Sequence, residues 1–236
     1  NIQFGEGGAG TFSDGKLNTQ THSGYNKQVF DTFIKFGAPA EIAYLNKPHI
    51  GSDKLRGVVK NMRAYIENNG GKVLFRTKLV DISAANGRIN SVTLENNGKK
   101  TKISPYALVL AVGHSARDTF YMLKNKGVNM RAKDFAVGLR IEHLQKNIGF
   151  SQYGKKYPLL PAADYKLVSH AGERACFSFC MCPGGFVMPA ASEANSLVTN
   201  GMSNYARSGI NANSALIVPV TSADFHSDDP LSGVEF

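Results

Sequence analysis

The sequence has few cysteines, no long apolar run and no visible leader, and each absence excludes a class of protein. Three cysteines among 236 residues cannot build a disulfide scaffold. The longest apolar run, at residues 107–112, is far shorter than the roughly 18 residues that a membrane-spanning helix needs. The first residues show no basic region followed by an apolar segment, so no signal peptide is visible. We therefore expect a cytoplasmic protein without a membrane partner.

The composition is that of a globular protein with a basic charge balance. Apolar residues make up 42% of the chain and charged residues 19%, which is enough to bury a core. Lysine and arginine number 27 against 18 aspartates and glutamates; the net charge of +9 suits an anionic partner or simply reflects a solvated surface. The basic clusters at 99–102 and 155–157 match no nucleic-acid-binding motif, so nucleic acid is not an expected partner.

Both ends of the sequence are typical of a cut chain. It begins at Asn1 rather than methionine, and residues 228–236 carry neither a helix stop nor a polar tail. We expect an internal piece of a longer polypeptide.

Hydrophobic spacing in the first half predicts helices and a parallel sheet. Helices are expected at 27–36, 40–45 and 53–69, the last capped by Ser52 and ended by Gly70-Gly71. The helix at 53–69 leads into a predicted strand at 72–76, an order typical of a βαβ unit.

A meander and a buried strand are expected next. The Asn-Gly pairs at 86–87 and 97–98 predict hairpins that join strands 77–84, 89–95 and 99–103. The apolar run at 106–112 predicts a central strand covered on both faces, followed by a short helix that Ser115 caps and that runs through Lys124.

From about residue 128 the pattern becomes mostly β. Residues 135–142 alternate with a period of two, and further strands are expected at 165–170, 175–181, 185–188, 196–199 and 214–220. We place a domain boundary near residue 126, between an α/β domain at 1–126 and a β-rich domain at 127–236.

The glycine-rich opening is the first candidate site. Residues 5–10 match G-x-G-x-x-G, yet neither a strand before them nor a helix after them is evident, so this is not a normal dinucleotide fingerprint. We expect an extended loop whose backbone N–H groups approach an anion or a flat ring, with Thr11, Ser13 and Lys16 as further donors. The alternative is a flexible exposed loop.

Two further motifs are weaker. The turn around Gly113 ends a predicted strand, where ligands often bind, but Gly113-His114-Ser115 lacks the second glycine of a hydrolase nucleophile elbow. Arg140 and His143 follow the best alternation and suit an anionic substrate; the alternative is a surface pair of Arg140 with Glu142.

The cysteines share one predicted strand. Regular alternation places Cys176, Cys180 and Cys182 on one face with Ser178, too far apart for an unstrained disulfide between neighbours. Their spacing is a poor match for zinc, and we expect no metal. Redox activity of Cys180 or Cys182 and inert buried thiols remain alternatives.

Several longer blocks resemble an uncharacterised bacterial family of FAD-dependent dehydrogenases in the glutathione-reductase-like superfamily. The resemblance covers nearly the whole chain. The blocks are FGEGGAGTFSDGKL (4–17), KPHIGSDKLR (47–56), LAVGHSARDT (110–119), FAVGLRIEH (135–143), AADYKL (162–167), FSFCMCPGG (177–185) and VTNGMS (198–203).

The resemblance implies a partial Rossmann-like FAD-binding domain with a β-meander, followed by part of an inserted substrate domain. It implies that Val80 lies by the adenine and that Ala111, Val112 and Gly113 lie near the cofactor. Arg140, His143, Cys180 and Cys182 are guesses at substrate contacts. The residues that would lie along the flavin are Gly7, Gly8, Ala9, Gly10, Thr11, Ser13, Asp14, Gly15 and Lys16.

The leading hypothesis is therefore a fragment of an FAD-dependent oxidoreductase that acts on a small molecule, with NAD(P)H as a candidate reductant. The alternatives are a non-redox flavoprotein that acts on or binds RNA, and a cofactor-free binding module. The family's first glycine-rich turn lies upstream of this sequence, so we expect the isolated chain not to retain FAD.

Overall fold

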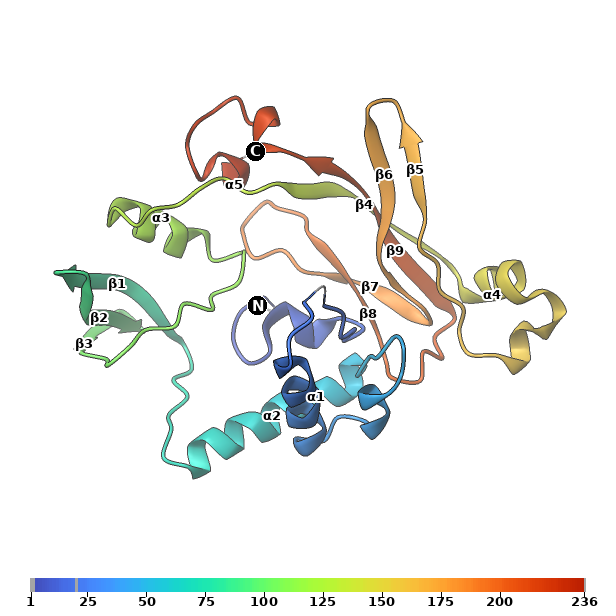
Figure 1. Cartoon of the computed structure of the whole chain (residues 1–236), viewed down its shortest axis with the longest axis horizontal. Coiled ribbons are helices and arrows are strands. Elements are labelled where there is room, and N and C mark those ends of the chain that lie inside the picture. Colours follow the sequence, from blue (N-terminus) through green and yellow to red (C-terminus); the bar gives the residue numbers. More distant parts are fainter. Residues whose placement is uncertain (1–2, 20, 236) are drawn as a thin grey trace. The chain divides into compact units, whose positions relative to one another are not determined.

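The computed structural model describes residues 3–19 and 21–235. It divides the chain into two compact units, each made of two sequence segments. Unit 1 joins Asn1–Lys72 to Ala136–Pro219, and unit 2 joins Val73–Phe135 to Val220–Phe236. Figure 1 shows the elements of both units, which are described separately below.

The first segment of unit 1 is helical. It contains η1 (Gly8–Phe12), α1 (Tyr25–Lys35), η2 (Ala40–Ala43) and α2 (Ser52–Asn68). The three helices predicted at 27–36, 40–45 and 53–69 are confirmed in place, although the second is a 3₁₀ helix. Ser52 is not the N-cap of α2: Gly51 holds that position, and the Ser52 hydroxyl instead donates to the carbonyl of Ser203.

Apolar side chains of these helices form the first core. Ile42, Ile50 and Val58 are almost fully buried at its centre. Phe30, Phe33 and Ile34 of α1 pack against it from one face of the helix, as the spacing predicts.

The second segment of unit 1 contains a four-stranded sheet and a separate β-hairpin. The hairpin comes between two strands of the sheet, β6 and β9, along the chain. The sheet has the order β4-β9-β6-β5, and β6 runs antiparallel to both β9 and β5. Strands β7 and β8 pair antiparallel with each other. The strands are β4 (Phe135–Leu144), β5 (Val168–Ala171), β6 (Arg174–Cys182), β7 (Gly185–Pro189), β8 (Thr199–Ser203) and β9 (Asn211–Val220).

The strands expected in this half are confirmed, with two differences. The strand expected at 196–199 lies later, at Thr199–Ser203. The helices α4 (Gln145–Tyr153) and η3 (Gly154–Leu159) were not predicted, because α4 has almost no apolar stripe for hydrophobic spacing to detect.

Unit 2 is built on the predicted meander. Strands β1 (Thr77–Ala85), β2 (Arg88–Asn96) and β3 (Lys99–Ile103) form one antiparallel sheet. Both Asn-Gly turns have positive φ at each position, as a type I′ hairpin requires. Helix α3 (Arg117–Asn125) contributes Leu123 to a core with Ile82 and Val92; η4 (Ser222–Asp224) and α5 (Ser232–Glu235) complete the unit.

Ser115 does not cap α3. Ala116 is the N-cap residue, and no side chain caps that end of the helix.

Two predicted strands are absent from the described chain. Residues 72–76 and 106–112 are irregular, and Val109 and Leu110 are 86% and 42% exposed, so the prediction of a buried central strand is wrong. Apolar residues on both faces indicate that a strand formed by this segment would be buried on both faces. The strand also needs adjacent strands whose backbone groups form hydrogen bonds with its own N–H and C=O groups. Every strand pairing detailed above is antiparallel, and a Rossmann-like domain is not confirmed.

Among the helices of the described residues, none is both long and apolar enough to cross a membrane.

Candidate functional site

The glycine-rich loop contains a short 3₁₀ turn rather than being extended throughout, which corrects the prediction in part. No α-helix starts at Gly10. Gly7, Gly8 and Gly15 have positive φ, a conformation that residues with a Cβ rarely adopt. The Ser13 hydroxyl donates to the carbonyl of Gly10 at 2.7 Å and accepts from the Gly15 N–H, so this hydroxyl stabilises the turn itself.

Asp14 fixes the end of the loop inside unit 1. Its side chain is only 1% exposed and accepts from two Arg207 nitrogens, Nε at 3.2 Å and Nη2 at 2.5 Å. The Ser203 hydroxyl donates to it at 2.5 Å, and the Lys16 ammonium lies at 3.3 Å. Burial alone would raise the pKa of Asp14, but the Arg207 hydrogen bond and the two nearby cations hold it below its usual value.

Lys16 connects this ion cluster to the cysteine strand. Its ammonium donates to the carbonyl of Met181, the residue between Cys180 and Cys182. Arg140 reaches the same stretch from β4, donating to the carbonyl of Cys180 at 3.4 Å and to Asn213 Oδ1 at 2.6 Å. Two cations from separate parts of the chain therefore meet at this end of β6.

The approach of Arg140 depends on a glycine. A Cβ at Gly201 would lie 2.2 Å from both Arg140 Nη1 and Asn213 Oδ1. Because neither group can occupy that space together with a Cβ, only glycine leaves room for their hydrogen bond.

A bulge in β6 changes the arrangement expected for the cysteines. Its register against β9 shifts between Phe179 and Cys182, and Cys180 has φ +47°. Cys180 is partly exposed and Cys182 has no exposed surface, so the cysteines do not share one face of a regular strand. All three cysteines are free thiols.

In the bulge, the Cys182 thiol turns back toward its neighbour and donates to the carbonyl of Cys180 at 3.3 Å. The neighbouring Cys182 thiol lowers the pKa of Cys180 to about 6, and the charges of Lys16 and Arg140 act in the same direction. The neighbouring Cys180 side chain and burial raise the pKa of Cys182.

His143 lies apart from this cluster of side chains. Its Nε2 is 2.7 Å from the hydroxyl of Tyr165, and its buried Nδ1 has no hydrogen-bond partner among the described residues. Burial raises the pKa of Tyr165, whereas the charge of Arg140 opposes that rise. Of the four predicted substrate contacts, the structure brings Arg140, Cys180 and Cys182 together and pairs His143 with tyrosine.

The remaining predicted cofactor residues belong to unit 2. Val80 is half-buried at a register shift in β1. Ala111, Val112 and Gly113 form an irregular turn before α3, with Gly113 at φ +73°. Their proximity to a cofactor stays a prediction.

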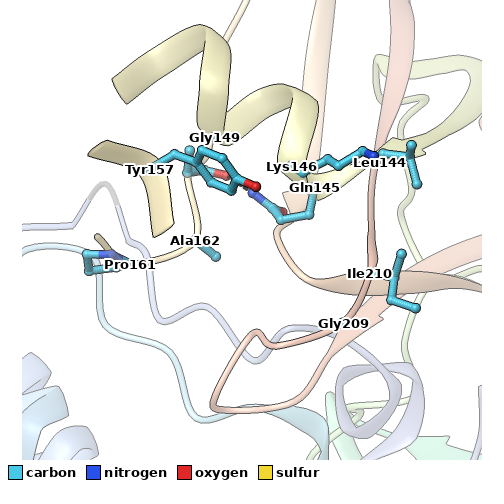
Figure 2. A pocket seen from close by; sticks show the side chains of 10 residues that line it. Leu144, Gln145, Lys146, Gly149, Tyr157, Pro161, Ala162, Gly209 and Ile210 are labelled. Carbon is cyan, nitrogen blue, oxygen red and sulfur yellow. Dashed lines mark hydrogen bonds between the residues drawn. The ribbon is translucent and has the colours of Figure 1, made fainter. Parts of the chain in front are cut away.

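Clefts lined by described residues of unit 1 include the following two. One, of about 280 Å³, lies beside α4 (Figure 2). Both polar ends of the Gln145 side chain in this cleft bind the backbone. Its amide nitrogen donates to the carbonyl of Ala163, and its oxygen accepts from the Gly184 N–H. The second, of about 300 Å³, borders the glycine-rich loop, and its lining residues are Glu6, Thr11, Phe12, Arg56 and Val59.

Sequence reasoning missed the residues that complete these sites. Arg207, Ser203 and Asn213 carry no motif, and they meet the loop or Arg140 only through folding. Arg56 belongs to the block at 47–56, where no local pattern marks it as functional, and its guanidinium lies 5.1 Å from the centre of the Phe12 ring. In the part of the chain that the structure describes, no three His, Cys, Asp or Glu side chains are grouped to hold a metal ion.

The match to a family model agrees with part of the expectation from sequence. Residues 134–236 match the model of the family described as FAD-dependent protein, C-terminal domain-like, which supports a flavoprotein family for this part of the chain. The whole chain is also similar to an uncharacterized protein of Clostridium beijerinckii, at 52% identity over 240 residues. The chain spans 44% of the length of that relative.

Proposed function

We propose that this chain is part of an FAD-dependent oxidoreductase, in which the glycine-rich loop lies along the cofactor. The observation that carries the proposal is a small-residue loop beside a cleft of about 300 Å³, in a chain whose residues 134–236 match an FAD-dependent family. The finer assignment, a Rossmann-like member of the glutathione-reductase-like superfamily, belongs to the same proposal and rests on the resemblance of the sequence blocks.

The loop fits a flat, anionic cofactor. Nothing lies within 4 Å of a Cβ built at Gly10, so that side of the loop is open to a ring or a phosphate. Arg56 lines the cleft of about 300 Å³ together with Thr11 and Phe12 of the loop, and it offers a planar cation for a phosphate or for stacking. FAD, when bound, supplies the redox chemistry by accepting or donating two electrons.

The side chains of Asp14 and Lys16 serve the loop in another way. Both point to partners in unit 1, Arg207 for Asp14 and the Met181 carbonyl for Lys16. We infer that they orient the loop, while its backbone N–H groups and Arg56 face the cofactor. The small-molecule substrate would be held near Arg140, and NAD(P)H is a candidate electron source.

The first test uses the longer protein that contains this chain, or its Clostridium relative. We expect a purified protein with the visible absorption of a flavin, reduced anaerobically by NADH or NADPH. A bound flavin that neither reductant bleaches would favour a non-redox flavoprotein, and a protein that cannot be loaded with FAD would leave a plain binding module. The 236-residue chain alone should be colourless.

A matched pair of glycine variants tests the loop itself. Gly10→Val in the longer protein should weaken FAD binding tenfold or more, about 1.4 kcal/mol, because the side chain fills the open side of the loop. Gly24→Val serves as control, since Gly24 also has open space around its Cβ but precedes α1. Equal FAD affinity in both variants would place the cofactor elsewhere.

A further inference from the structure

We propose that Cys180 and Cys182 form a redox-active dithiol that exchanges with small disulfides, Cys180 as the attacking thiol and Cys182 as the resolving thiol. Nothing in this proposal depends on FAD. It rests on three observations about the end of β6, namely the bulge, the unequal exposure of the two thiols and the cations around them.

The bulge changes the spacing between the two cysteines. On a regular strand, residues two apart are separated by about two rises of 3.3 Å, near the upper limit for a disulfide. Here an extra residue in β6 and the left-handed backbone of Cys180 break that spacing. The Cys182 thiol also donates to the carbonyl of Cys180 at 3.3 Å, so its side chain turns back toward its neighbour.

Exposure assigns the two roles. Cys180 is partly exposed, and we assign it as the thiol that meets an external disulfide. Cys182 has no exposed surface and can react only with Cys180. Redox-active cysteines commonly pair an accessible thiol of low pKa with a resolving neighbour.

The surrounding charges favour the thiolate of Cys180. Lys16 from the loop and Arg140 from β4 donate to the two carbonyls at this position, and the Cys182 thiol lies beside the sulfur. Asp14 is the acidic group that acts on Cys180, and its charge is offset by Arg207. Together these groups lower the pKa of Cys180 and increase its thiolate fraction relative to an ordinary cysteine.

The exchange balances without any further reagent. The Cys180 thiolate attacks one sulfur of the small disulfide R–S–S–R, forming a mixed disulfide and releasing R–S⁻, which takes up the proton of Cys182. The Cys182 thiolate then attacks the Cys180 sulfur and releases the second R–S⁻, which takes a proton from solvent. One dithiol is oxidised to a disulfide and one R–S–S–R is reduced to two R–SH.

The test uses dithiobis(nitrobenzoate), an anionic aromatic disulfide whose released thiol is coloured. Near pH 6, the chain should release two equivalents of the coloured thiol in its fastest phase and retain no adduct. Peptide mapping should then show a disulfide between Cys180 and Cys182. The fast phase should exceed the rate of an ordinary thiol of pKa about 8.5 by roughly tenfold near pH 6, since a larger thiolate fraction outweighs lower nucleophilicity.

Three serine variants separate the roles. Cys182→Ser should release one equivalent in the fast phase and keep one adduct on Cys180, whereas Cys180→Ser should lose that phase. Cys176→Ser is the matched control on the same strand and should behave as the parent chain. A stable adduct on Cys180 in the parent chain, or a fast phase that survives in Cys180→Ser, would overturn the proposal; mapping the parent chain needs no variant to fold.

Discussion

Replacing Asp14 with asparagine should destabilise the chain strongly, because Asp14 is a buried anion with three partners. Its carboxylate accepts from Arg207 and Ser203 and lies beside Lys16, and its side chain is 1% exposed. Asp14→Asn keeps the volume but removes the charge, leaving Arg207 partly buried beside a neutral amide. Removing one partner of a buried ion pair costs about 3–5 kcal/mol.

Urea unfolding followed by far-ultraviolet circular dichroism measures this loss. The matched control is Asp164→Asn, which breaks the exposed pair of Lys47 and Asp164 in the same unit and should cost less than about 1 kcal/mol. A double variant, Asp14→Asn with Arg207→Met, should lose less than the sum of the two single losses, since no unpaired guanidinium remains. Equal stability of Asp14→Asn and the control would refute the role of Asp14.

The ion pair of Asp14 and Arg207 also predicts how the stability of the chain depends on pH. The pKa of Asp14 is lower in the folded chain than its ordinary value of about 3.9. Its contribution to the free energy of unfolding is therefore complete above about pH 5 and is lost as pH falls through the folded pKa. The stability difference between the parent chain and Asp14→Asn should shrink below about pH 4, and a constant difference down to strong acid would contradict this.

Three further changes test other parts of unit 1. Lys16→Met should raise the pH midpoint of the Cys180 reaction, because the Lys16 charge lowers the pKa of Cys180, whereas Lys27→Met on exposed α1 should leave the midpoint unchanged. Gly201→Ala should cost about 1–3 kcal/mol in urea unfolding, because its Cβ would lie 2.2 Å from Arg140 Nη1. Gly57→Ala, in α2 with open space around it, should instead gain about 0.5–1 kcal/mol; the same loss in both alanine variants would exclude a specific clash at Gly201.

The elements that sequence predicted well are those determined by neighbouring residues. The Asn-Gly pairs set both hairpins of the meander, because few residue pairs adopt two consecutive positive φ angles. The long helix α2 followed from its apolar spacing and from the glycines that end it. In each case the signal and the structure that it produces lie within a few residues of each other.

The two missing strands show where that reasoning fails. The segments 72–76 and 106–112 have strand-like composition, but forming a strand depends on partners elsewhere in the sequence. Leu108 does reach the core of unit 2 with Ile82 and Val92, whereas Val109 and Leu110 stay exposed. The composition therefore indicated that these residues are apolar enough to be buried in a strand. It did not indicate whether the described chain contains the adjacent strands that such a strand must pair with.

Local sequence patterns predicted individual residues of the candidate site, but they did not predict the contacts that bring these residues together. The loop, Arg140 and the cysteine pair were each singled out from local patterns. Arg207, which pairs with Asp14 from the segment between β8 and β9, is separated from it by 193 positions and belongs to no motif. The bulge was also hidden, because the alternation of residues 175–181 reads as a regular strand and Cys180 gives no local sign of a left-handed backbone.

These contacts link the two proposals physically while leaving them separable. Asp14 and Lys16 are successive charges of one loop: the first holds the loop to Arg207 and the second reaches the carbonyl between the two cysteines. A change in the loop would therefore alter the charge that Cys180 experiences. Among the described residues, Gly10 and Cys180 share none of the contacts named above, so Gly10→Val is read out in flavin binding and Cys180→Ser in thiol exchange. If both variants impaired flavin binding equally, the loop and the end of β6 would have to form one site.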